Sequence, residues 1–189
     1  MRVLIAEDEA LIRMDLREML EEDGHEVVGE ARDGAEAITL ARASSPDVVF
    51  MDVKMPNVDG IEAARTISAE AIAPVVMVTA FSQAGLVEEA AQAGAMGYVV
   101  KPFTRNDIAP AMQVAVSRHA ELRLLTQQVG DLEERLETRK LLDRAKGILM
   151  AAGLTEPEAF KRLQKLAMDK RKSLRDVAEA VITADELKR

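Results

Sequence analysis

The sequence predicts a parallel α/β domain over residues 1–120, then a long helix and a small all-α unit. In the first part, five short runs rich in β-branched residues alternate with longer amphipathic segments, which is typical of a parallel sheet covered on both faces by helices. A helical pattern then continues from Asp107 to about Met150. Its only internal proline, Pro110, lies in the first turn, where proline is tolerated. Two further helical segments with capping signals follow Gly153.

The elements of the α/β domain follow one another in a regular order. The five expected strands cover residues 3–6, 26–29, 47–51, 75–79 and 98–100. The helical segments cover residues 10–22, 34–43, 60–72, 84–94 and 105 onward. Three strands carry continuously apolar runs, at residues 3–5, 48–50 and 75–78, as expected for strands buried on both faces.

Composition excludes several classes of protein. The chain has 189 residues, of which 48% are apolar and 31% charged, so it can bury one large or two small cores. It contains no Cys, which excludes disulfides and thiolate zinc sites, and its only two His residues, His25 and His119, lie far apart. No apolar run approaches the roughly 18 residues of a membrane span, and the first residues turn acidic too early for a signal peptide. We therefore expect a cytoplasmic protein that does not contact a membrane.

Charge is distributed unevenly along the chain. Residues 1–119 hold 10 basic and 20 acidic side chains, whereas residues 139–175 hold 11 basic and 4 acidic ones. An acidic first part and a basic later segment indicate two separate functions, although a basic helix face can also be merely solvated.

The long helix carries an apolar seam. Apolar residues recur at alternating spacings of 3 and 4, at Leu122, Leu125, Val129, Leu132 and Leu136. Such a heptad pattern predicts either a dimeric coiled coil or a helix docked within the monomer.

The end of the chain predicts two more helices, which complete a three-helix unit. Thr155 and Glu158 form a capping-box pattern, and Ser173 is a second candidate N-cap. Apolar residues at helical spacing follow each cap, and we expect Phe160, on the first apolar stripe, to be a core residue.

Five polar side chains lie at the ends of strands of the predicted sheet. They are Glu7, Asp8, Asp52, Thr79 and Lys101. The carboxyl ends of parallel strands meet at one edge of a sheet, so the three carboxylates are expected to converge and to bind a hard divalent cation such as Mg²⁺. One carboxylate could then accept a phosphoryl group as an acyl phosphate. Because no glycine-rich nucleotide-binding loop is present, the phosphoryl donor must be another protein or a small molecule. A site that accepts a phosphoryl group in this way is typical of a regulatory switch.

The motifs at these strand ends resemble the receiver domain of two-component response regulators. They are AEDE at 6–9, MDVKMP at 51–56 with Asp59-Gly60, Thr79-Ala80, and GYVVKPF at 97–103. The resemblance covers residues 1–120 and implies a flavodoxin-like (βα)5 fold with a five-stranded parallel sheet. It implies that Asp52 is the phosphoacceptor and that a sensor histidine kinase is the donor.

The same resemblance assigns roles to the other residues of this edge. Mg²⁺ would be bound by Glu7, Asp8, Asp52 and the backbone carbonyl of Lys54. Thr79 and Lys101 would contact the phosphate, and Tyr98 would be an aromatic switch residue. The Lys101–Pro102 peptide bond would be cis, an isomer essentially confined to bonds that precede proline.

The last part resembles the ANTAR output domain, an RNA-binding antitermination module. The matching residues are AKGILM at 145–150, EAF at 158–160, Leu163, Ala167, Leu174 and Val177-Ala178. The whole chain resembles the phosphorylation-dependent antitermination regulators of actinobacteria, whose members bind structured RNA hairpin loops. We expect a receiver at 1–120, a helical linker at 121–138 and the output domain at 139–189.

Basic side chains of the output domain are candidates for RNA phosphate contacts. We expect the contacts at Arg139, Lys140, Arg144, Lys146, Lys161, Arg162, Lys165, Arg171 and Lys172, with Lys170 and Arg175 nearby. Gly147 inside a helix costs roughly 1 kcal/mol relative to Ala, which indicates close approach of a packed helix or of the RNA backbone.

Three functions remain to be compared. The first is a switchable RNA binder that pairs into a homodimer on phosphorylation, and the second is a DNA-binding response regulator. Against the second, residues 173–182 are mostly apolar, whereas a recognition helix presents polar side chains to the bases. The third is an enzyme that hydrolyses a small phosphoester. We favour the first and expect no enzymatic turnover beyond slow loss of the phosphoryl group.

Overall fold

The structure is a computed structural model that describes residues 1–80 and 84–187. It divides into two compact units, residues 1–123 and 124–189. The helices that the structure describes include none that is long and apolar enough to cross a membrane.

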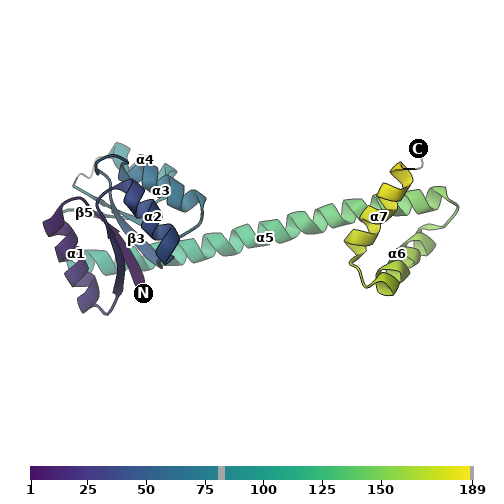
Figure 1. The fold of residues 1–189 in the computed structure, drawn as a ribbon, viewed down its shortest axis with the longest axis horizontal. Helices are drawn as coiled ribbons and strands as arrows, with labels where there is room; N and C mark the ends of the chain where they lie inside the picture. Colours follow the sequence, from purple (N-terminus) through teal and green to yellow (C-terminus); the bar gives the residue numbers. More distant parts are fainter. Residues whose placement is uncertain (81–83, 188–189) are drawn as a thin grey trace. The chain divides into compact units, whose positions relative to one another are not determined.

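The first unit is built on a five-stranded parallel sheet with the strand order β2-β1-β3-β4-β5 (Figure 1). The strands are β1 (Arg2–Ala6), β2 (Glu26–Ala31), β3 (Val48–Asp52), β4 (Val75–Thr79) and β5 (Gly97–Val100). The helices are α1 (Ala10–Glu22), α2 (Gly34–Ser44), α3 (Gly60–Ala69), α4 (Ala84–Gln92) and α5 (Arg105–Ala151). The predicted flavodoxin-like (βα)5 fold is confirmed.

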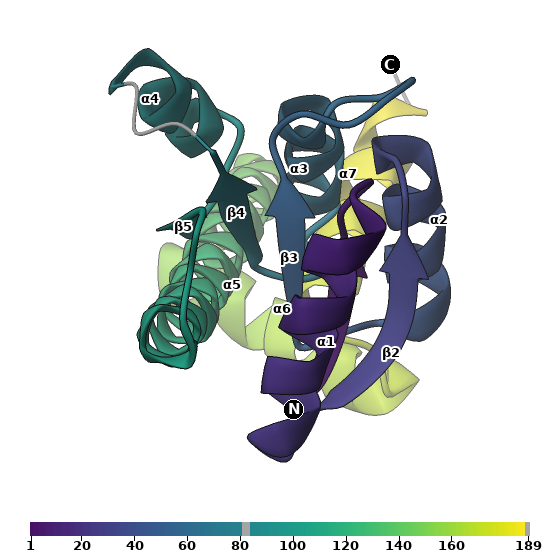
Figure 2. The ribbon, with the colours of Figure 1, turned by 90° about the vertical axis from the view of Figure 1, so that its left-hand side faces the viewer.

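Alternate side chains of the strands enter two separate cores, one on each face of the sheet. On one face, side chains such as Leu4 and Met51 pack against α2, α3 and α4. On the other face, side chains such as Val3 and Phe50 pack against α1 and the first turns of α5. Figure 2 shows α1 and α5 on one side of the sheet and α2, α3 and α4 on the other. Burial on both faces explains why the central strands are continuously apolar.

The second unit joins the end of α5 to α6 (Glu156–Lys170) and α7 (Leu174–Glu186), as the sequence predicts. Its core contains Ala145, Leu163, Ala167, Val177, Ala178 and Ile182. Both predicted caps form. The backbone N–H of Thr155 donates to Glu158 at 2.8 Å, and the N–H of Asp176 donates to the Ser173 hydroxyl at 3.0 Å. Each cap satisfies backbone groups that the first helical turn leaves unpaired.

In this part of the chain, the expectation for Phe160 is wrong, and one of the two alternatives for Gly147 is excluded. Phe160 is not a core residue, because the buried stripe of α6 runs through Ala159, Leu163 and Ala167 and leaves Phe160 39% exposed. No helix packs closely on Gly147 either, since a Cβ there would meet nothing within 4 Å in the described structure.

The apolar seam of α5 is exposed within each of the two units. All five of its side chains, from Leu122 to Leu136, are more than half exposed. Both alternatives that the heptad pattern leaves open, a coiled coil between chains and docking within one chain, stay predictions.

The start of α3 is pressed against the end of β3. A Cβ added to Gly60 would lie 1.8 Å from the carbonyl oxygen of Asp52. We expect Gly60→Ala to lower the free energy of unfolding by about 1–3 kcal/mol, because the backbone must move to relieve the overlap. Denaturant unfolding measures this loss. The control Gly85→Ala, at an exposed position of α4 with open space around it among the described residues, should not lower the free energy of unfolding. Equal losses in both variants would contradict the packing argument.

Candidate functional site

The predicted acidic residues converge at the carboxyl end of the sheet. Glu7 and Asp8 follow β1, and Asp52 ends β3, the neighbouring strand, whose Met51 lies opposite Ala6. One carboxylate oxygen of each acidic residue lies within 4.8 Å of the others. Three oxygen donors at this separation are the ligand type that Mg²⁺ prefers, so these residues fit the expected ion.

Burial differs among the three carboxylates. Glu7 is 1% exposed and Asp52 is 6% exposed, whereas Asp8 lies at the surface. Burial raises the pKa of the Glu7 carboxyl above its ordinary value, and the hydrogen bond from Lys101 opposes this only in part. The protein thus holds negative charge where water cannot fully solvate it, which favours binding of a cation.

Lys101 supplies a positive charge between the two buried carboxylates. Its Nζ atom lies 2.7 Å from Oε2 of Glu7 and 3.0 Å from Oδ2 of Asp52. Burial lowers the pKa of the Lys101 ammonium, but the hydrogen bonds to both carboxylates outweigh it and leave the pKa raised. The backbone N–H of Lys101 donates to the Thr79 carbonyl at 2.8 Å, and the Lys101–Pro102 bond is cis, as the resemblance implies.

A small cavity opens beside these groups. Its volume is about 180 Å³, and it is lined by Asp8, Glu9, Asp52, Val53, Lys54, Thr79, Ala80 and Lys101. Buried Thr79 ends β4, and small Ala80 follows it, so a compact group bound to Asp52 would meet a hydroxyl and an ammonium. The structure therefore brings together the residues that the sequence assigns to phosphate and metal.

Tyr98 lies apart from this cavity. Its side chain is 53% exposed and borders a separate hollow between β5 and the start of α5 that also contains Asn106 and Arg118. The described conformation is thus one in which the expected switch residue points outward.

Sequence reasoning missed Arg13, which supports the acidic loop from α1. Its Nη1 atom donates to the backbone carbonyl of Glu7 at 2.6 Å, and its Nε atom pairs with Glu30 of β2 at 3.1 Å. Arg13 is 9% exposed and precedes the buried residues Leu16 and Leu20 of α1 by three and seven positions. A charged residue on a buried helical stripe needs a hydrogen-bonding or charged partner. The position of Arg13 on the buried stripe of α1 was therefore the signal by which the sequence could have indicated its role.

The predicted RNA contacts are spread over three segments of the second unit. Arg139, Lys140, Arg144 and Lys146 lie on α5, Lys161, Arg162 and Lys165 on α6, and Arg171 and Lys172 between α6 and α7. The three on α6 line one hollow of about 450 Å³ together with Gly153, Leu154 and Glu158.

Ion pairs separate these cations into two groups. Arg144 pairs with Glu186 at 2.7 Å, and Lys146 pairs with Asp143 at 2.8 Å and Glu156 at 2.9 Å. Nearby Arg175 is also engaged, with Glu179 at 3.1 Å. Within residues 1–80 and 84–187, the other seven form no ion pair: Arg139, Lys140, Lys161, Arg162, Lys165, Arg171 and Lys172. These seven are the cations most available to an external anion.

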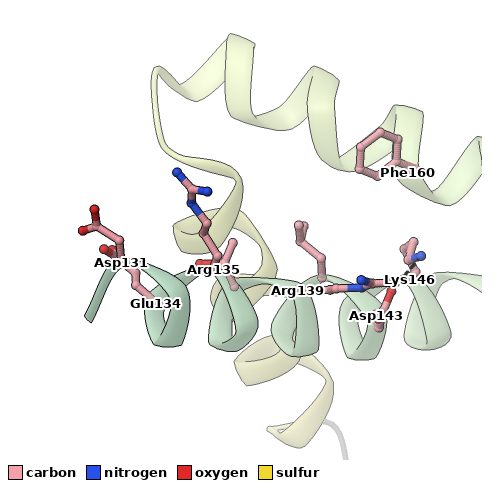
Figure 3. A pocket seen from close by; sticks show the side chains of 9 residues that line it. Asp131, Glu134, Arg135, Arg139, Asp143, Lys146 and Phe160 are labelled. Carbon is pink, nitrogen blue, oxygen red and sulfur yellow. Dashed lines mark ion pairs between the residues drawn. The ribbon is translucent and has the colours of Figure 1, made fainter. Parts of the chain in front are cut away.

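A larger hollow lies between α5 and α6 (Figure 3). This α5–α6 pocket has a volume of about 690 Å³ and is lined by Asp131, Glu134, Arg135, Thr138, Arg139, Leu142, Asp143, Lys146 and Phe160. It contains two of the predicted RNA contacts, Arg139 and Lys146, and the exposed ring of Phe160.

Comparisons with known proteins match the first and the second unit of the chain to different domain families. Residues 3–113 match the response regulator receiver domain family, and residues 130–182 match the ANTAR domain family. The transcriptional regulatory protein PdtaR of Mycobacterium tuberculosis is 59% identical over 182 residues, which cover 96% of this chain and 89% of PdtaR. Both resemblances inferred from the motifs are confirmed.

Other relatives match the first unit alone. The chemotaxis protein CheY of Bacillus subtilis is 41% identical over 112 residues, which cover 59% of this chain and 93% of CheY. The signal receiver domain of NarL from Mycobacterium tuberculosis matches with a TM-score of 0.59 at 34% identity, over 61% of this chain and 95% of that domain.

The contact between Arg13 and the acidic loop predicts an effect on metal binding. We expect Arg13→Met to weaken Mg²⁺ binding about 10-fold, because the Glu7 carbonyl loses its donor and the loop loses its orientation. Isothermal titration of the unphosphorylated protein with Mg²⁺ measures this. The control Arg17→Met removes an exposed partner of the same Glu30, at 2.7 Å, that is not bonded to the loop. Equal Mg²⁺ affinities for both variants would show that Arg13 does not position the loop.

Proposed function

Because the chain belongs to the two-component response regulators that join a receiver domain to an ANTAR output domain, we propose a phosphorylation switch that controls RNA binding. A sensor histidine kinase phosphorylates Asp52, and the phosphorylated protein binds RNA hairpin loops and causes transcription antitermination. The observation that carries the proposal is the shared edge of the sheet, where Lys101 lies between Glu7 and Asp52. The protein acts in the cytoplasm, where both partners are found.

The phosphoryl transfer uses groups that the cavity already holds. A carboxylate oxygen of Asp52 forms a bond to phosphorus while the bond from phosphorus to the kinase histidine breaks. The histidine nitrogen keeps the bonding electrons and takes up a proton from water. Glu7, Asp8, Asp52 and the Lys54 carbonyl would hold Mg²⁺, which when bound would neutralise charge on the carboxylate and phosphoryl oxygens.

Two further residues contact the transferred group. The Lys101 ammonium exchanges part of its contact with Asp52 for a phosphoryl oxygen, and the Thr79 hydroxyl donates to another. Tyr98 then moves from its exposed position toward the space that Thr79 vacates. Loss of the phosphoryl group to water is slow and is the only turnover that the site performs.

An acyl phosphate acts by shifting an equilibrium between two states of the receiver. The size of this shift cannot exceed the difference between the interaction free energies of the acyl phosphate with the two states. Changing the ratio of the two states from 1:99 to 99:1 requires a difference of about 5.5 kcal/mol. Helix α5 carries the change, because it contributes Ile108 and Met112 to the core of the first unit and Ala145 to that of the second.

The surface of the second unit supports RNA as the ligand. Its unpaired cations neutralise phosphates, so binding weakens as salt concentration rises. The exposed surface of Gly147 leaves room for an RNA backbone to approach α5 closely. The exposed seam of α5 pairs two phosphorylated chains and thereby presents two output domains.

Asp52 should control both phosphorylation and RNA binding. With acetyl phosphate and Mg²⁺, wild type is expected to take up one phosphoryl group per chain and Asp52→Asn none, as measured by mass spectrometry. Beryllofluoride, a phosphate mimic, should raise wild-type affinity for a hairpin RNA pool at least 10-fold without affecting Asp52→Asn. The control Glu18→Gln neutralises an exposed carboxylate of α1 that lies outside the cavity and should respond as wild type.

Two results would reject this function. Tighter binding to duplex DNA than to hairpin RNA of matched stem sequence would favour a DNA-binding regulator. Turnover of many equivalents of a phosphoester would indicate an enzyme.

The seam should be required for pairing of phosphorylated chains. We expect beryllofluoride-loaded wild type to sediment as a dimer and the double variant Val129→Asp, Leu132→Asp as a monomer, because charge is costly in a coiled-coil interface. The control Leu124→Asp changes an equally exposed side chain of α5 outside the seam and should leave the dimer intact. Dimerisation through α5 is the wrong mechanism if loaded wild type stays monomeric at high concentration.

A further inference from the structure

The α5–α6 pocket contains an aromatic ring that the core of the second unit does not use. Phe160 is the only aromatic residue in positions 124–189, and it lies outside the set of side chains that form that core. Figure 3 shows its ring on α6, facing the stretch of α5 that carries the charged lining residues. An exposed ring at the wall of a hollow is a surface on which a flat ligand can stack.

Cations from α5 line the same pocket. Arg135 and Arg139 line the pocket, and neither lies within ion-pair distance of a carboxylate in the described structure, although the charge of Arg139 contributes to the lowered pKa of Asp143. Lys146, in contrast, is held between Asp143 and Glu156. The two guanidinium groups are therefore the pocket cations that can pair with phosphates of an incoming strand.

Carboxylates in the same pocket oppose a phosphate in its interior. Asp131, Glu134 and Asp143 line it, and the hydrogen bond from Lys146 lowers the pKa of Asp143, which keeps that carboxyl ionised. Three negative groups repel an anion but accept hydrogen bonds from amino and imino N–H groups. The pocket chemistry thus fits a nucleobase inside and phosphates at the rim.

We propose that the α5–α6 pocket binds one unpaired base of an RNA hairpin loop, stacked on Phe160 with its amino edge toward Asp143, the lining carboxylate at the level of the ring in Figure 3. Arg139 and, further along α5, Arg135 pair with phosphates of the strand that leads to that base. Guanine fits best, because its N1–H and N2–H groups lie on one edge and a carboxylate accepts both. Uracil fits worst, because carbonyl oxygens flank its single N–H. The inference rests on the proposed function, since RNA is the ligand, and it assigns loop recognition to one pocket.

The probe is a pool of hairpin RNAs with one fixed stem and randomised loops, presented to the full chain loaded with beryllofluoride and Mg²⁺. The best-binding hairpin is then synthesised with an abasic residue at each loop position in turn. Phe160→Leu keeps an apolar side chain but removes the aromatic face, and Phe160→Tyr restores that face. The matched control Met168→Ala truncates another exposed apolar side chain of α6 that lies outside the pocket.

We expect Phe160→Leu to lose about 10-fold in affinity, whereas Phe160→Tyr and Met168→Ala bind as wild type. At one loop position, the abasic residue should weaken wild-type binding about 10-fold and Phe160→Leu binding not at all, which is the coupling expected of groups in contact. Guanosine at that position should bind more tightly than uridine. Thermal unfolding should be unchanged in all three variants.

Other outcomes separate the two proposals. The pocket does not bind a base if Phe160→Leu binds the hairpins as tightly as wild type does. The same conclusion follows if each abasic residue weakens the binding of wild type and of Phe160→Leu equally. A preference for uridine at the coupled position overturns the assigned orientation. If wild type binds no hairpin of the pool, the proposed function itself fails.

Discussion

The ammonium group of Lys101 balances two buried carboxylates, and the arrangement of the receiver edge depends on that balance. Glu7 and Asp52 come from adjacent strands, so the parallel register that joins β1 to β3 places two negative charges beside each other. Burying like charges together is costly unless an opposite charge lies within contact distance. Lys101 supplies this positive charge from the position directly after β5. In the sheet, β5 is separated from β3 only by β4, and the Lys101 ammonium contacts both carboxylates. With Asp8 added, negative charge still exceeds positive charge, and this excess is what a divalent cation would neutralise.

The parts of the fold that sequence reasoning predicted are those whose signal is local. Apolar runs such as 48–50 predict strands because both faces of the sheet are covered, and Thr155 and Ser173 predict helix starts because a cap needs only neighbouring residues. The convergence of the strand-end carboxylates could also be predicted from the sequence, since the carboxyl ends of parallel strands lie at one edge of the sheet.

The errors arose where burial depends on small differences in helix rotation or on distant partners. Phe160 and Ala159 are adjacent in sequence, and about 100° of rotation separates a buried side chain from one that borders a hollow. Arg13 resembles an ordinary surface charge until the carbonyl of Glu7 and the carboxylate of Glu30 are placed beside it. Neither the facing helix nor the neighbouring strand can be read from the residues around these positions.

Tyr98 has a practical consequence beyond its place in the proposed switch. The chain contains one Tyr and no Trp, so its ultraviolet emission comes almost entirely from a single phenol ring. That ring is solvated in the described conformation. A natural fluorophore is thus attached at the very position whose surroundings should differ between resting and activated molecules, and spectroscopy can follow it without any label.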